Sequence, residues 1–163
     1  MIISPIPLKW WYGLVFNGMF VLIIVGTGLV LMFRPSQLVI SDSETGKIYG
    51  RWNIKNGDTF SIEFIHSVNM SPVIDTFLIS GKEICPFSTR FFAYGAGMQS
   101  DLEPGQVLTR DGDSMIITGF TQSFRELQYI VGTVSDHLLS LRDEQVSLRT
   151  LCGKNAHIRI RVK

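Results

Sequence analysis

Hydrophobic residues follow two different patterns along this chain. Residues 10–33 form an almost uninterrupted apolar run, in which Asn17 and Thr27 are plainly polar and the phenol of Tyr12 is the one ionisable group. The run is longer than the about 20 residues with which a helix crosses the hydrocarbon core of a bilayer. Beyond residue 35, apolar and polar residues alternate with a period of two, as in half-buried β-strands. The pattern predicts one transmembrane helix followed by a β domain.

The flanks of the apolar run support a membrane anchor. Trp10 and Trp11 stand at one end, where aromatic rings favour the headgroup layer, and Arg34 and Pro35 close the other end. A cleaved signal peptide is disfavoured, because its apolar region spans only about 7–15 residues. Residues 1–35 are therefore predicted to be a cytoplasmic N-terminus and a single uncleaved anchor. The short flank with Lys9 favours the cytoplasmic side for the N-terminus and places residues 36–163 outside.

One stripe of the predicted anchor carries small and hydrogen-bonding residues. Gly13, Asn17 and Gly28 fall on one face at helical periodicity. Such residues let membrane helices pack closely on other helices. The stripe is either an interface with a partner helix or a set of incidental residues on a plain anchor.

Residues 36–163 are predicted to be rich in strands joined by turns. In the strand expected over 59–67, one face holds Phe60, Ile62, Phe64 and His66. Residues 156–163 alternate more cleanly, with Ile158 and Ile160 on the face opposite to Arg159 and Arg161.

Turn signals divide the remaining sequence. Asp111-Gly112 predicts a hairpin, because these residues tolerate the positive φ of tight turns. Ser80-Gly81 separates two further strands, and 135–144 is the best segment for a helix beyond Arg34. The fold class expected is all-β, an antiparallel sandwich or small barrel preceded by one transmembrane helix.

Charge is nearly absent from residues 1–33 and balanced in the rest of the chain. Residues 1–33 hold Lys9 as their one charged side chain, and all 14 acidic residues of the chain lie at Asp42 or later. Since a nucleic-acid-binding domain needs an excess of Lys and Arg, nucleic acid is not expected as a partner. The length beyond residue 35 suits one domain with a real core.

Few residues suggest catalysis or metal binding. Adjacent strand residues point to opposite faces, so His66 and Ser67 are not expected to form a nucleophile–base pair, and the histidines lack ligand spacing. We therefore predict no catalytic residue, no metal and no cofactor. His66 is either a buried core residue or part of a ligand or interface site, and Asp75 could face it across the turn at 69–72.

Two further features remain open at the level of sequence. Cys85 and Cys152 could form one disulfide outside the cytoplasm, or remain two unrelated thiols. The segment Tyr94-Gly95-Ala96-Gly97-Met98 lacks the third glycine and the βαβ context of a dinucleotide site. Its two glycines indicate either a tight bend or the close approach of another chain or ligand.

These segments together resemble an uncharacterised family of small bacterial proteins with an N-terminal anchor. The resemblance rests on three short motifs, namely His66-Ser67-Val68, then Pro72-Val73 with Asp75, then Tyr94-Gly95-Ala96-Gly97-Met98. Asn69 departs from the family pattern, which usually has Glu at that place. Members of the family accompany TAXI-type TRAP transporters, which are ion-driven importers with a soluble solute receptor.

The resemblance implies a non-catalytic accessory subunit of a TRAP transporter for organic acids. The chain would sit in the bacterial inner membrane with its β domain in the periplasm, and would contact the permease, the TAXI-type receptor or both. The motif residues would then form contact or ligand sites. The alternative is a free-standing, membrane-anchored module that binds a small ligand near His66 and Asp75.

Overall fold

The computed structural model describes residues 35–93 and 101–163. The chain divides into two compact units, Met1–Pro35 and Ser36–Lys163, and the description below concerns the second. The predicted anchor, with its stripe of Gly13, Asn17 and Gly28, lies outside the described residues, as does the segment Tyr94–Met98. No helix within 35–93 and 101–163 is long and apolar enough to cross a membrane.

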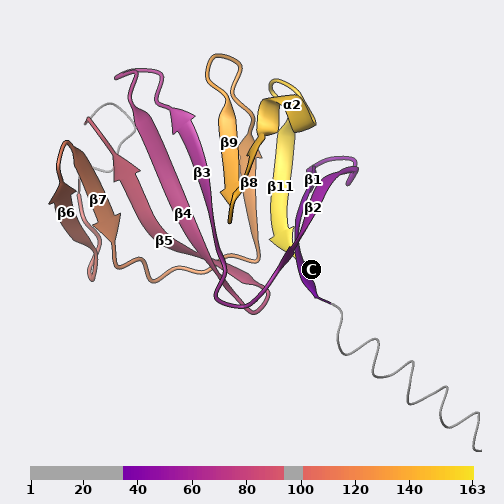
Figure 1. The fold of residues 1–163 in the computed structure, drawn as a ribbon, viewed down its shortest axis with the longest axis horizontal. Helices are drawn as coiled ribbons and strands as arrows, with labels where there is room; N and C mark the ends of the chain where they lie inside the picture. The colour runs from indigo at the N-terminus through magenta and orange to yellow at the C-terminus, as the bar shows by residue number, and fades with distance from the viewer. Residues whose placement is uncertain (1–34, 94–100) are drawn as a thin grey trace, which may run out of the picture. The chain divides into compact units, whose positions relative to one another are not determined.

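The second unit consists of strands with one short helix (Figure 1). The first strands are β1 (Ser36–Asp42), β2 (Ile48–Ile54), β3 (Thr59–Ile65), β4 (Pro72–Ser80) and β5 (Glu83–Phe91). They are followed by β6 (Val107–Asp111), β7 (Ser114–Thr118), β8 (Glu126–Ile130), β9 (His137–Leu141), β10 (Glu144–Ser147), α2 (Leu148–Cys152) and β11 (His157–Val162).

The strands form two antiparallel sheets. One has four strands in the order β2-β1-β11-β8, and the other has seven in the order β10-β9-β3-β4-β5-β7-β6. Figure 1 shows β6 and β7 at the left-hand edge of the larger sheet and β1, β2 and β11 of the smaller sheet on the right, and side chains from both sheets share one core. The predicted all-β, antiparallel class is confirmed, and the architecture is consistent with a β-sandwich.

The period-2 alternation selects the faces that form the core. Phe60 and Ile62 of β3 are 2% and 0% exposed, and Ile158 and Ile160 of β11 are both fully buried. These side chains belong to one cluster that draws residues from both sheets. We call this cluster the main core. Removing such apolar area from water is the largest favourable contribution to folding.

The predicted turns are present. β6 and β7 pair from Val107↔Thr118 to Asp111↔Ser114, and Gly112 has φ of 59° between them. Gly81, with φ of 61°, lies between β4 and β5. Residues with a Cβ adopt such positive φ values at a cost, so glycine favours these tight hairpins.

The segment 135–144, the best but weak candidate for a helix, does not form one. His137–Leu141 is strand β9, which pairs with β3, and Glu144–Ser147 is strand β10. The turn between them has Arg142 at φ of 54°. Leu139 and Leu141 alternate into the main core, so tertiary burial overrides the weak helical propensity of this segment. The one described helix, Leu148–Cys152, follows it and begins at the N-cap Ser147.

The two cysteines lie in different parts of the sandwich. Cys85 is on β5 and Cys152 ends α2, and both are half-buried free thiols. Burial raises the pKa of Cys152 to about 11, so this thiol stays protonated at neutral pH.

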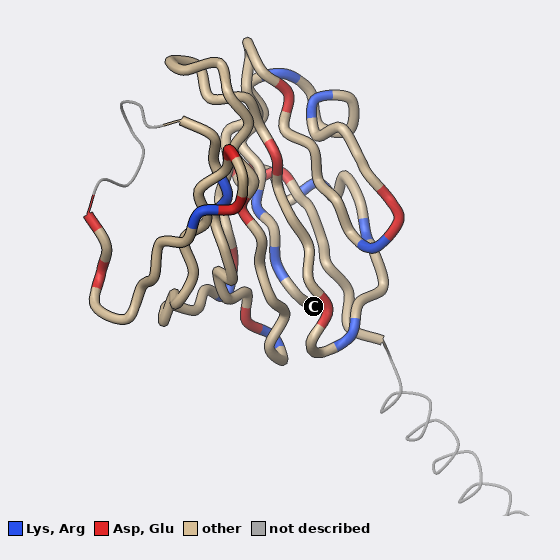
Figure 2. Tube along the Cα trace, turned by 60° about the vertical axis from the view of Figure 1, so that its left-hand side comes forward, with Lys and Arg blue, Asp and Glu red and all other residues tan. Residues whose placement is uncertain are grey.

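Acidic and basic residues are interspersed over the strands and turns in the view of Figure 2. Of the ion pairs that the described residues form, Arg142–Asp58 joins the β9–β10 turn to the β2–β3 turn at 2.6 Å, and Arg159–Glu126 joins β11 to β8 at 3.2 Å. Both are at least partly open to solvent, and such pairs contribute little to stability. The packing of the sheets therefore stabilises this domain far more than its charges do.

Candidate functional site

The first sequence motif forms the turn between β3 and β4. The last strand pair is Ile65↔Pro72, and the backbone N–H groups of His66 and Met70 donate to Ser71 and His66, both at 2.9 Å. Met70 adopts φ of 51° to close the turn. His66, Ser67 and Val68 therefore lie on one tight connection at one end of the sandwich.

His66 does not lie among the core residues of β3. The strand ends at Ile65, so the ring is half-buried in the turn, and its Nδ1 accepts a hydrogen bond from the backbone N–H of Val68 at 3.3 Å. The expected pairing of β3 with β4 is confirmed, but its register places Asp75 opposite Ile62. This is about 13 Å along the strand from His66. The prediction that Asp75 faces His66 is wrong.

The second motif, Pro72-Val73, begins strand β4 directly after the turn. Val73 is 3% exposed and packs with Phe91 and Ile117 in a second buried cluster, which we call the end cluster. The side-chain amide of Asn69 donates to the carbonyl of Ala93 at 2.8 Å. The turn is thereby fixed to the residue that precedes Tyr94, the start of the third motif.

A loop between β8 and β9 stands beside this turn. Asp136 organises it by accepting hydrogen bonds from the Ser147 hydroxyl at 2.6 Å, the His137 N–H at 2.7 Å and the Arg149 N–H at 3.0 Å. Burial raises the pKa of Asp136, but these hydrogen bonds outweigh burial and the net pKa is lowered. Arg149 also donates to the carbonyl of Gly132 at 3.1 Å. The start of α2 thus holds the loop in one conformation.

His137 is the aromatic centre of the site. Its ring stacks on Phe64 with centroids 5.2 Å apart and meets Tyr129 edge-on at 6.2 Å. Its Nδ1 accepts from the backbone N–H of Gly132 at 3.2 Å. Burial lowers the pKa of His137 more than neighbouring Asp136 raises it, so the ring is neutral at pH 7. Sequence reasoning noted His137 only as one of three histidines without ligand spacing, although its place in H-L-L-S-L fits a strand.

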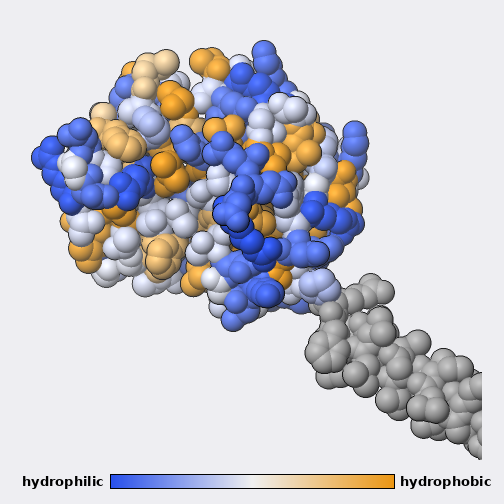
Figure 3. Space-filling model, in the orientation of Figure 1, coloured by the Kyte–Doolittle hydropathy of each residue, from blue (hydrophilic) through white to orange (hydrophobic). Residues whose placement is uncertain are grey.

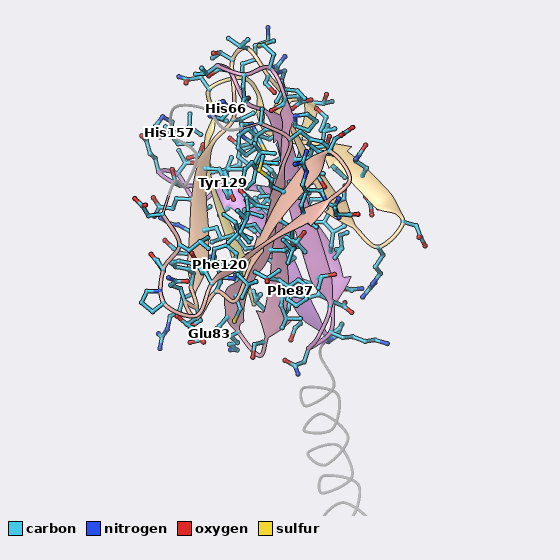
Figure 4. All side chains as sticks on the ribbon, turned by 90° about the vertical axis from the view of Figure 1, so that its left-hand side faces the viewer. His66, Glu83, Phe87, Phe120, Tyr129 and His157 are labelled. Atoms are coloured by element: carbon cyan, nitrogen blue, oxygen red, sulfur yellow. The ribbon has the colours of Figure 1, made fainter. Side chains whose placement is uncertain are left out.

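An open pocket lies between the β3–β4 turn and the β8–β9 loop. Its volume is about 480 Å³. The residues that line it are Phe64, Ile65, His66, Ser67, Gly132, Thr133, Val134, Ser135 and His137. A smaller cavity of about 120 Å³ lined by Glu63, Ser135 and Asp136 among others shares part of this wall. Figure 4 shows His66 near this end of the sandwich and Tyr129 further toward its middle.

Asp75 lies between the main core and the end cluster. It pairs with Ile62 on one side and Thr89 on the other, and Thr89 in turn pairs with Ile117. Thr89 Oγ1 donates to its carboxylate at 2.8 Å, and burial raises the pKa of Asp75. Burial and the nearby Asp75 also raise the pKa of Tyr129, on the opposite sheet. A buried carboxylate costs free energy, and proteins retain one mainly where it has a role.

Apolar side chains are exposed around the mouth of the pocket. Val68, Met70 and Val134 are 63%, 69% and 80% exposed. All three sit on the β3–β4 turn or the β8–β9 loop, which lie at the top of Figure 1, and Figure 3 shows hydrophobic residues exposed along the same edge of the domain. Ser36, where the β domain follows the N-terminal segment, lies at the other end, because β1 runs antiparallel to β11 and His157 of β11 pairs with Ile130. We call the end with the two loops the loop end.

The geometry shows what the site can do chemically. Since Nδ1 of His66 already accepts from Val68, the neighbouring Ser67 hydroxyl does not have this nitrogen as a base. Within residues 35–93 and 101–163, no group of three or more His, Cys, Asp or Glu side chains is arranged to hold a metal ion. The pocket instead offers hydrogen-bond donors beside aromatic and aliphatic surfaces, which is typical of binding sites.

Comparison with known proteins gives one family. The model of a family described as a domain of unknown function, DUF1850, matches residues 60–148. This range includes the turn, the pocket and the β8–β9 loop. No curated protein and no solved structure matches the chain.

Proposed function

The chain belongs to the DUF1850 family, and from this premise we propose that it is a non-catalytic accessory subunit of a TAXI-type TRAP transporter. In this proposal residues 1–35 anchor it in the bacterial inner membrane, and the β domain lies in the periplasm. The loop end contacts the permease or the solute receptor during uptake of organic acids. The transporter class comes from the resemblance of the sequence motifs.

The exposed apolar side chains of the loop end carry the proposal. Val68, Met70 and Val134 are all more than 60% exposed on two neighbouring loops. Apolar patches at exposed positions mark protein contact sites when they gather in one place. The hydrogen bonds of Asp136 hold one of these loops in a fixed conformation, so less entropy is lost when a partner binds.

A membrane tether would make such a small contact sufficient. Two proteins held in the same membrane meet at a high effective concentration, so a weak contact between periplasmic domains becomes occupied. Gly13, Asn17 and Gly28 of the predicted anchor would add a contact between helices inside the bilayer. Within the β domain, the loop end lies at the opposite end of the strands from Ser36.

Recovery of the partner from native membranes tests this proposal. The tagged full-length protein is purified in mild detergent, and co-purifying proteins are identified and quantified by mass spectrometry. Stoichiometric recovery of a TRAP permease is expected, and recovery of the protein alone, under conditions that keep known complexes intact, contradicts the proposal.

A pair of variants locates the contact. Val68→Asp places a charge on the loop end and is expected to lower recovery about tenfold, because it buries an unpaired carboxylate in the interface. Val107→Asp is the matched control, since Val107 is similarly exposed, at 53%, but lies on β6 at the far edge of the larger sheet. Equal recovery with both variants counts against the loop end.

The pocket favours a second candidate function, a free-standing ligand-binding module. Its volume of about 480 Å³ suits a small molecule. In this case a ligand raises the melting temperature of the protein in the absence of any partner. Partner recovery without such a shift favours the subunit, and a shift without partner recovery favours the module.

A further inference from the structure

The two histidines that line the pocket are held in the same way. Nδ1 of His137 accepts from the backbone N–H of Gly132 at 3.2 Å, and Nδ1 of His66 accepts from the backbone N–H of Val68 at 3.3 Å. His66 lies in the β3–β4 turn and His137 is the first residue of β9, yet each ring uses the same nitrogen as an acceptor. This common arrangement fixes where the proton of each neutral ring resides.

A ring nitrogen that accepts a hydrogen bond carries no proton, so each neutral imidazole carries its proton on Nε2. An Nε2–H group has no lone pair for a metal ion. Histidines that bind metals through Nε2 instead donate their Nδ1–H to an acceptor, which backbone N–H groups exclude here. The pocket therefore presents donors for an oxygen acceptor and is unsuited to metal coordination.

The charges around the pocket would not repel a negatively charged ligand. The side chains that line it include no carboxylate. Asp136, which lies beside it, already accepts three hydrogen bonds, and Glu63 belongs to the adjoining smaller cavity. Apolar surface from Phe64, Ile65 and Val134 completes the wall. The ligand should thus combine an acceptor group with a short apolar body.

We propose that this pocket binds a small organic carboxylate through the Nε2–H groups of His66 and His137. Both rings line the same pocket, so both can donate to one carboxylate, and hydrogen bonds to a charged acceptor are about twice as strong as neutral ones. The aliphatic part of the ligand lies on Phe64 and Val134. The inference rests on the hydrogen bonds of the pocket itself, so a protein that recovers no permease still binds the carboxylate.

The test uses isovalerate as the probe, with its neutral amide and inorganic phosphate for comparison. Full-length protein in mild detergent is labelled with ¹⁵N-histidine, and the imidazole nitrogen signals are followed by NMR during titration. Isovalerate is expected to shift the signals of His66 and His137 but not of exposed His157. The amide should bind about tenfold more weakly, and phosphate should also bind more weakly, because it has no apolar part to lie on Phe64 and Val134. Absence of a shift with isovalerate, or equal binding of the amide, overturns the proposal.

Variants of His66 distinguish its role as a hydrogen-bond donor to the ligand from a role in the fold. His66→Leu is expected to raise the dissociation constant for isovalerate about tenfold, because one hydrogen bond to the carboxylate is lost. His66→Gln keeps an N–H donor and should restore most of the binding, while His157→Leu is the control that leaves binding unchanged. If His66→Leu fails to fold, Val134→Asp supplies the test, since its charge should repel the carboxylate. Unchanged binding in the folded His66 or Val134 variant contradicts the proposed site.

Discussion

The main core and the loop end of the sandwich are built from different interactions. The main core takes aliphatic and aromatic side chains from both sheets, such as Phe60, Ile62 and Ile160, all nearly or fully buried. The loop end has a small cluster of Val73, Phe91 and Ile117, and its pocket is lined by two histidines. The main core stabilises the fold. The polar groups held in place for binding at the loop end lower the stability, and the main core offsets this loss.

Polar side chains lie at the boundary between the main core and the loop end. Asp75 lies where the main core gives way to the end cluster, with Ile62 and Thr89 as its neighbours across the sheet. Tyr129 lies near it on the other sheet, and the ring of Tyr129 contacts that of His137, which lines the pocket. These three polar groups thus lie on the side of the interior that leads to the loop end, where a ligand or partner would be recognised.

Truncation of the main core should have the largest effect. Phe60→Ala removes a ring that is 2% exposed and stacks on Phe77 at 5.1 Å. The free energy of unfolding should fall by about 3–5 kcal/mol, measured by urea denaturation followed by circular dichroism. Val68→Ala at the loop end should change it by less than about 0.5 kcal/mol. Similar losses for both variants would remove the distinction between the regions.

A methyl group at Gly132 should disturb the loop end. The Cβ of Gly132→Ala would meet the carbonyl oxygen of Ser135 at 2.3 Å, so the loop has to shift and the hydrogen bond to His137 weakens. We expect a loss of roughly 1–3 kcal/mol in unfolding free energy, together with loss of the isovalerate-induced NMR shift.

Gly46→Ala is the matched control for this prediction. Gly46 has φ of 72° with no atom within 4 Å of an added Cβ, so the change strains the backbone by about 1 kcal/mol but leaves the pocket intact. Full isovalerate binding by Gly132→Ala would show that the loop tolerates the methyl group and that Gly132 does not position His137.

Neutralising Asp75 should stabilise the domain by a smaller amount. Burial raises the folded pKa of Asp75 above its unfolded value of 3.8, so the stability linked to this group is present at low pH and is lost as pH rises through the folded pKa. Asp75→Asn keeps an acceptor for Thr89 and should raise the unfolding free energy at pH 7 by about 1 kcal/mol. The gain should disappear below about pH 4.

Melting temperatures between pH 4 and pH 8 measure this difference. Asp113→Asn, in the exposed β6–β7 turn, serves as the control and should leave the melting temperature at pH 7 unchanged. A loss of stability at pH 7 in Asp75→Asn would mean that the fold needs the ionised carboxylate. Burial of Asp75 would then not lower the stability of the domain.

Local patterns in the sequence were sufficient for much of the fold. The strand over 157–162 and the Asp111–Gly112 hairpin depend on alternation and turn chemistry, which act between near neighbours. The segment 135–144 was the best candidate for a helix, although a weak one, because it holds too little local signal for a strand. Pairing with β3, far away in the sequence, decided that residues 137–141 are a strand.

The candidate site was predictable only in part. His66 was singled out by its motif, but its position depends on β3 ending at Ile65, one residue before it. His137 was not selected, because the contacts that define it come from Phe64, Tyr129 and Gly132 on other elements. Spacing along the chain does not encode such contacts.

By itself, the sequence determined which residues can share a face of a strand and where the chain can turn, since both follow from steric limits on a few adjacent residues. It also set the contrast between an apolar N-terminal run and a charge-balanced β domain. Only the tertiary structure decided which strands became neighbours, and so brought the β3–β4 turn beside the β8–β9 loop. The backbone N–H groups of these loops then fixed both imidazole tautomers, because a hydrogen bond depends on distance and direction in space.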